Sequence, residues 1–68
     1  MRVKVNYKIR SIRTARNMTL QELSDLSGVS TSQISDIERN LHDATVSTIC
    51  CIADALGLEP QELFEVVR

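Results

Sequence analysis

The chain has 68 residues, enough for a single domain, with a formal net charge of −1 and 43% hydrophobic residues. One Phe, one Tyr and no Trp leave the core to be built from Leu, Ile, Val and Ala. A domain this small buries only about 60% of its unfolded surface, which favours dimerisation. A run of about 18 apolar residues is absent from the sequence, which excludes a membrane span of that kind. No signal peptide is recognisable, so we expect a cytoplasmic protein.

The charge is unevenly distributed. Residues 1–16 contain six cations and no acid, whereas the remainder contains two cations and nine acids. The six cations are Arg2, Lys4, Lys8, Arg10, Arg13 and Arg16. The distribution fits a basic face that attracts phosphates, and it fits equally a charge-segregated surface without a partner.

The first predicted element is a helix over residues 6–16, with Asn6 as its cap and Ile9 and Ile12 at helical spacing. The residues before it, from Arg2 to Val5, alternate polar and apolar. This segment fits a short strand or a frayed end, and we expect the frayed end.

The next two predicted helices, 20–27 and 31–39, are joined at a glycine. Thr19 and Glu22 have the spacing of a capping box, and Gly28 ends the first helix because it tolerates a left-handed backbone. Ser30 is a suitable cap for the second helix, which closes at Asn40. Two helices joined by a short turn that contains Gly form a helix-turn-helix arrangement.

The last two predicted helices cover residues 46–56 and 60–67. The former carries an apolar stripe and ends at Gly57, and Pro60 suits the first turn of the latter. Helices this short are not stable alone and must pack on one another. We therefore expect an all-α fold, a compact five-helix domain over residues 1–68.

The adjacent cysteines Cys50 and Cys51 fall in helix 46–56, with Cys50 at the flank of the stripe and Cys51 outward. A bridge between neighbours strains disulfide geometry, and two cysteines make neither a disulfide framework nor a zinc site. We expect reduced thiols, no metal and no cofactor; a redox role would need an exposed Cys51. Without a nucleophile–base pair, a carboxylate pair or a glycine-rich phosphate loop, an enzyme is not expected.

The sequence resembles the lambda-repressor-like family of helix-turn-helix proteins, also called the Xre or Cro type. The matching segments are IRSIR (9–13), MTLQELSDLSGVS (18–30), ISDIER (34–39), Ile49, residues 52–53, ALGL (55–58) and ELF (62–64). The resemblance implies a lambda-repressor-like domain that binds double-stranded DNA and regulates transcription, usually as a repressor. It implies neither a membrane partner nor a small-molecule ligand.

The resemblance also assigns roles to individual residues. Arg13 and Glu38 match a partly buried ion pair that ties the first helix to the third; an exposed, weak pair is the alternative. The base-reading candidates are Thr31, Ser32, Gln33 and Asp36. Gln33 matches a position nearer the phosphates, but it reaches adenine if it tilts inward.

Contacts with the DNA backbone are expected at helix starts, where free amides point outward, and in the loop after the third helix. The candidates are Asn17, Thr19, Gln21, Ser30, Ser35, Arg39, Asn40, His42, Thr45 and Ser47. His42 fits a loop residue better than a metal ligand because no second ligand accompanies it.

Three positions depart from the family pattern. Leu20 replaces a Gln that contacts phosphate, and Asn40 replaces Gly. Asp36 can accept from cytosine N4, but it also repels phosphate. Together with the net charge of −1, this leaves open a protein-interaction module of the same fold, such as an antitoxin.

The expected assembly is a homodimer on an inverted repeat, with half-sites about 34 Å apart. The expected dimer interface lies at the end of the fifth helix and consists of Leu58, Phe64, Val66 and Val67. The strand-like N-terminal segment is the second choice.

Overall fold

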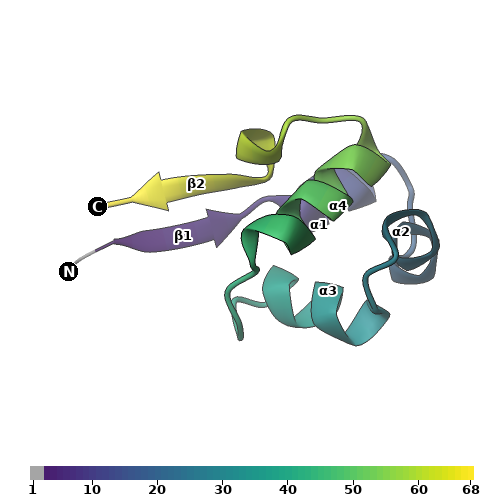
Figure 1. The fold of residues 1–68 in the computed structure, drawn as a ribbon, viewed down its shortest axis with the longest axis horizontal. Helices are drawn as coiled ribbons and strands as arrows, with labels where there is room; N and C mark the ends of the chain where they lie inside the picture. Colours follow the sequence, from purple (N-terminus) through teal and green to yellow (C-terminus); the bar gives the residue numbers. More distant parts are fainter. Residues whose placement is uncertain (1–2) are drawn as a thin grey trace.

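The computed structural model describes residues 3–68, which form four α-helices, one 3-10 turn and two strands (Figure 1). In chain order these are β1 (Lys4–Tyr7), α1 (Ile9–Ala15), α2 (Leu20–Ser27), α3 (Thr31–Glu38), α4 (Val46–Leu56), η1 (Pro60–Leu63) and β2 (Phe64–Val67). The helices form one body, and the two strands project together from one side of it. Arg2, the first cation of the basic N-terminal segment, lies outside the described residues.

Side-chain caps define where three of the helices begin. The Thr19 hydroxyl accepts from the Glu22 amide at 3.0 Å, and the Glu22 carboxylate accepts from the Thr19 amide at 2.9 Å, which completes the capping box of α2. The hydroxyls of Ser30 and Thr45 accept from backbone amides in the first turns of α3 and α4.

A left-handed residue ends each α-helix. These residues are Asn17 (φ 54°), Gly28 (φ 77°), Asn40 (φ 57°) and Gly57 (φ 69°). At the ends of α1, α3 and α4, the amide of the residue after the left-handed one donates to the carbonyl five residues earlier. The Leu41 amide, for example, donates to the Asp36 carbonyl at 2.9 Å. This arrangement satisfies carbonyls that would otherwise lack partners at the helix ends.

The helix predicted over residues 60–67 is wrong. Pro60 does begin a helical turn, but η1 is short and Phe64 is already extended, with φ −148° and ψ 162°. β2 instead pairs antiparallel with β1, and Tyr7 lies opposite Phe64. The β-branched valines of β2 favour a strand once a partner strand is present, and this partner comes from the other end of the chain. The fold is therefore mostly helical with a two-stranded sheet, not a five-helix domain.

The same pairing corrects the beginning of the chain. Residues Lys4–Tyr7 form β1, so the frayed end is wrong, and so is the helix cap expected at Asn6. α1 begins at Ile9 instead. The Lys8 amide donates to the Leu63 carbonyl at 2.7 Å, which continues the ladder from β1 toward α1.

A cluster of aliphatic side chains fills the space between the helices. Its members are Ile9, Leu23, Val29, Ile34, Ile37, Ile49, Ile52, Ala53, Leu56 and Leu63. α4 supplies four of them and packs against both α2 and η1. Within residues 3–68, no helix has the length and apolar character to cross a bilayer.

Candidate nucleic-acid interface

The corner between α2 and α3 sets the direction of α3. The Gly28 amide donates to the Ser24 carbonyl at 2.8 Å, and the left-handed backbone of Gly28 turns the chain there. Val29 follows and is buried in the core, while its amide donates to the Ser27 hydroxyl at 3.2 Å. The corner is therefore anchored on both sides, and α3 lies at the edge of the helical body (Figure 1).

An ion pair joins α1 to the end of α3. Arg13 Nε and Nη2 donate to the two carboxylate oxygens of Glu38 at 2.9 and 3.1 Å, and Arg13 Nη1 donates to the Met18 carbonyl at 2.9 Å. Only 12% of the Arg13 side chain and 5% of the Glu38 side chain are exposed. The hydrogen bond to Glu38 raises the pKa of Arg13 against the opposing effect of burial. This pair holds the position of α3 relative to α1.

α3 has one buried side and one open side. Ile34 and Ile37 are 0% and 1% exposed, so they fix the helix to the core. The exposed polar candidates are Ser32, Gln33 and Arg39. The half-buried ones are Thr31, Ser35 and Asp36. We call these six polar residues the α3 polar face.

Gln33 is tied to the start of α4. Its Nε2 lies 3.5 Å from Thr48 Oγ1, and Thr48 Oγ1 lies 2.9 Å from Thr45 Oγ1. Thr48 was not predicted as a site residue. Its position, three residues after a helix cap, is the only signal that the sequence offers. The contact draws Gln33 toward the cap of α4, where a phosphate contact was predicted.

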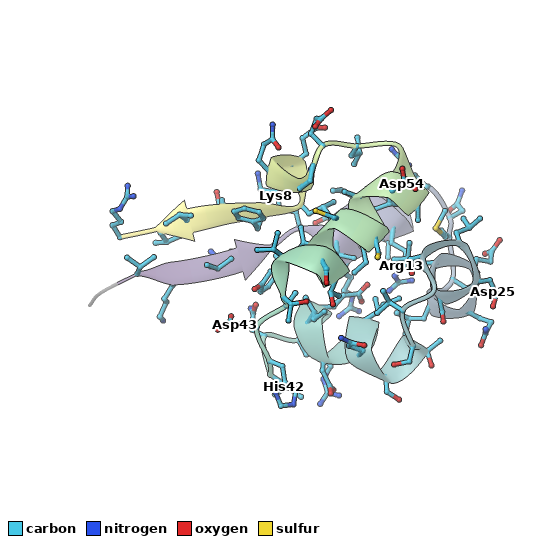
Figure 2. All side chains as sticks on the ribbon, viewed as in Figure 1. Lys8, Arg13, Asp25, His42, Asp43 and Asp54 are labelled. Carbon is cyan, nitrogen blue, oxygen red and sulfur yellow. The ribbon has the colours of Figure 1, made fainter. Side chains whose placement is uncertain are left out.

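Asp36 and His42 meet at the other end of α3. His42 Nε2 lies 3.8 Å from Asp36 Oδ2, and His42 comes from the loop that follows the helix (Figure 2). Asn40 in the same loop is exposed. On the α3 polar face, the acid therefore lies beside a residue that is cationic only when protonated.

The backbone candidates on α2 have partners within the helix. Thr19 serves as the cap described above, and Gln21 Nε2 donates to Asp25 Oδ1 at 2.8 Å. Asn17, in the turn before α2, is exposed. Ser47, in the first turn of α4, is exposed as well.

Two of the N-terminal cations are used within the fold. Arg13 pairs with Glu38, and Arg16 Nη1 donates to the Leu56 carbonyl at 2.6 Å, at the end of α4. A cation at a helix C-terminus is favourable because the backbone carries negative partial charge there. The basic segment is therefore partly a structural feature, and these two side chains do not extend freely toward a ligand.

Tyr7 is a second residue that the sequence did not single out. Its hydroxyl accepts from the Ala44 amide at 3.1 Å and lies 3.3 Å from Asp43 Oδ1. These contacts connect β1 to the end of the loop between α3 and α4. They link the sheet to the loop that carries His42.

The predicted dimer residues on β2 divide between the two faces of the strand. Phe64 and Val66 share one face of β2, and Val67 points to the other face because side chains alternate along a strand. Leu58 follows α4 and is partly buried against the core. In the structure, only Phe64 and Val66 of this set belong to a common strand face.

Both cysteines are exposed, including Cys50, which was expected at the flank of the apolar stripe. Among the described residues, no three His, Cys, Asp or Glu side chains are grouped as a metal site would require.

Comparison with known proteins identifies the fold. The profile of the family described as helix-turn-helix matches residues 9–63. The chain belongs to the lambda-repressor-like helix-turn-helix family. The resemblance drawn from the sequence is thereby confirmed.

Relatives of this helix-turn-helix chain include two regulators. The immunity repressor of Bacillus phage phi105 is 34% identical over 55 residues, which are 81% of this chain and 38% of the repressor. The uncharacterized HTH-type transcriptional regulator y4dL of Sinorhizobium fredii is 34% identical over 68 residues, covering 94% of this chain and 35% of y4dL. The helix-turn-helix chain thus spans little more than a third of either relative.

One solved structure matches this chain over most of its own length, unlike the two relatives above. The restriction-modification controller protein C.AhdI from Aeromonas hydrophila superimposes with a TM-score of 0.79 at 35% identity. The match covers 84% of this helix-turn-helix chain and 86% of the controller chain.

Proposed function

We propose that this domain binds double-stranded DNA with α3 in the major groove and regulates transcription, as a repressor, in the cytoplasm. The observation that carries the proposal is the open α3 polar face, which projects from a helix fixed by the buried Ile34 and Ile37. The major groove of B-DNA admits an α-helix and presents a distinct pattern of donors and acceptors for each base pair. The immunity repressor of phage phi105 supports the direction of the effect. The proposed activity is binding and not catalysis.

The proposed contacts divide between bases and backbone. Thr31, Ser32 and Asp36 contact bases, and Gln33 does so or contacts a phosphate from its place beside Thr48. Proposed backbone contacts come from the ends of the helices and the loop after α3, at Asn17, Thr19, Gln21, Ser30, Ser35, Arg39, Asn40, His42, Thr45 and Ser47.

The proposed assembly on DNA is a homodimer that binds an inverted repeat. Two α3 helices then enter successive major grooves, about 34 Å apart. The restriction-modification controller matches this domain over 86% of its own chain. This match supports a regulatory function for a domain of this size.

Selection of bound sites from random duplex DNA tests the proposal. We expect one enriched half-site, recovered as an inverted repeat with a fixed spacing. Fluorescence anisotropy with a duplex that contains the selected site, and with a scrambled duplex as control, then measures the preference. Sequence-specific binding would be contradicted if the selection enriched no sequence, or if the selected and scrambled duplexes bound with equal affinity at moderate salt.

A second candidate is a protein-interaction module of the same fold, favoured by the charge of the α3 polar face. Arg39 is its only permanent cation among the described residues of that face, and Asp36 is an acid on it. Binding to duplex DNA would weaken as salt rises, with a slope set by the number of phosphates contacted, whereas an interface dominated by apolar contacts would not. A salt titration with the selected duplex therefore separates the two candidates.

A further inference from the structure

The two-stranded sheet has unpaired outer edges. Within residues 3–68 the sheet contains only β1 and β2, each of four residues. An isolated two-stranded sheet of this length is marginal in water. Tyr7 and Phe64 attach this sheet to the core, while Val3 and Val66 remain exposed. A cleft of about 400 Å³ opens beside β1, lined by Val3, Lys4, Val5, Asn6, Asn40 and Asp43. The β1 edge is therefore accessible to a further strand.

The ladder determines which backbone groups face that edge. The Lys8 amide donates to the Leu63 carbonyl, so these two residues form a hydrogen-bonded pair next to β1. Hydrogen-bonded and non-hydrogen-bonded pairs alternate along an antiparallel ladder, which puts Val5 and Tyr7 at non-hydrogen-bonded positions. The amide and carbonyl groups of Val5 and Tyr7, and of Val3 in the same alternation, consequently point away from β2.

We propose that two copies of this chain associate through the β1 edge, antiparallel and centred on Val5, to form a four-stranded sheet. Identical strands related by a two-fold axis pair antiparallel, which matches the closed symmetry of most homodimers. The inference rests on the dimer in the proposed function and assigns the surface that forms it.

The side chains of β1 fit this register. On the apolar face, Val5 lies opposite the partner's Val5, and Val3 lies opposite the partner's Tyr7. On the polar face, Lys4 lies opposite the partner's Asn6. Over residues 3–7, apolar side chains therefore meet apolar ones and no like charges are opposed, as a stable strand pair requires. Val66, which is 46% exposed, lies opposite Val5 in the same copy, on the side away from the partner strand.

The outer edge of β2 is a poorer match. Like Phe64, Val66 directs its amide and carbonyl outward, because Val66 lies opposite Val5 at a non-hydrogen-bonded position. Pairing centred there sets Phe64 against the partner's Arg68 and Glu65 against the partner's Val67. Each of these pairs opposes a charge to an apolar side chain, so the chemistry favours β1.

Proline substitutions test the two edges separately. Val5→Pro removes an outward amide of β1 and leaves the ladder with β2 complete, since proline is tolerated at edge positions that face solvent. Val66→Pro is the matched control on the outer edge of β2. Sedimentation equilibrium without DNA should show a wild-type dimer, a dissociation constant raised at least about tenfold by Val5→Pro, and little change with Val66→Pro. Circular dichroism verifies that both variants are folded.

Hydrogen exchange on the wild-type chain provides a test that needs no variant. The Val5 and Tyr7 amides should become protected as protein concentration rises, while the Val66 amide stays unprotected. A monomer at millimolar concentration, a dimer unaffected by Val5→Pro, or protection that does not depend on concentration would each overturn the inference. Binding of one copy to a single half-site duplex measures the DNA contacts independently, so failure of the β1 interface is distinguishable from failure of DNA binding.

Discussion

At the scale of single residues, the position of α3 depends on a small number of side chains with defined partners. Glu38 is the clearest of these because it is nearly buried and its charge is balanced by Arg13 alone among the described side chains. A buried charge without a partner is costly, whereas a pair of well-packed apolar residues can replace a buried ion pair at little cost.

We predict that Glu38→Ala lowers the free energy of unfolding by about 3–5 kcal/mol because it leaves Arg13 uncompensated. A domain of this length is stable by only about 3–10 kcal/mol, so the variant should be largely unfolded near room temperature. The double variant Arg13→Met/Glu38→Leu should recover most of the loss. Urea titration followed by circular dichroism measures both, and a Glu38→Ala midpoint equal to that of the wild type would refute the prediction.

The sequence locates the candidate side chains of α3 well but not the contacts that they make. Helical periodicity separates Ile34 and Ile37 from the polar residues between them, because burial follows the same period as the helix. Periodicity carries no information about a partner on another element. Gln33 contacts Thr48, and Arg16 contacts the Leu56 carbonyl. Both contacts depend on how α1 and α3 pack against α4, so they could not be predicted from the sequence.

At the scale of the elements, the corner between α2 and α3 depends on backbone conformation. Gly28 has φ 77°, and a Cβ built on it meets no atom within 4 Å. A side chain at this position therefore has room, and the whole cost of adding one comes from the left-handed backbone.

We expect Gly28→Ala to destabilise the domain by about 1–2 kcal/mol, the cost of a left-handed backbone for an L-residue. Gly28→Asn should cost less because Asn adopts this conformation more readily, as Asn17 and Asn40 do in this chain. Thermal unfolding should give melting temperatures that decrease from the wild type to Gly28→Asn to Gly28→Ala. Equal melting temperatures for the Ala variant and the wild type would show that the corner is not fixed at this residue.

The two ends of the chain show where element prediction fails. Caps and left-handed residues lie next to the helices that they bound, so α2, α3 and α4 follow from local sequence. β1 and β2 lie at opposite ends of the sequence, with all four helices between them, and each strand is stabilised by pairing with the other. Leu63, Phe64 and Val67 have a spacing that also fits a helix, and only the distant partner strand decides between the two structures.

At the scale of the whole molecule, charge is arranged in a way that the net value of −1 does not convey. Two N-terminal cations are bound within the fold, and Arg39 is the permanent cation of the α3 polar face. Few phosphates are therefore within reach of a positive side chain from this face. The proposed complex should depend on shape and hydrogen bonds at the bases to a larger extent than a strongly basic domain does.

Substitutions of Arg39 and Ser32 should separate the contribution of phosphate contacts from that of hydrogen bonds to the bases. The logarithm of the binding constant falls with the logarithm of salt concentration by about 0.9 per neutralised phosphate. Arg39→Ala should therefore reduce that slope by about 0.9 per bound copy and weaken binding to every duplex. Ser32→Ala should leave the slope unchanged and lower the preference for the cognate duplex by about 2–10-fold, the value of one hydrogen bond.

Anisotropy titrations between 50 and 200 mM salt, on cognate and scrambled duplexes, measure both quantities. Both residues are exposed, so the variants should melt within a few degrees of the wild type, which serves as the control for folding. If Arg39→Ala left the slope intact and Ser32→Ala left the preference intact, α3 would not be the DNA-contacting element. The protein-interaction module would then be the favoured candidate.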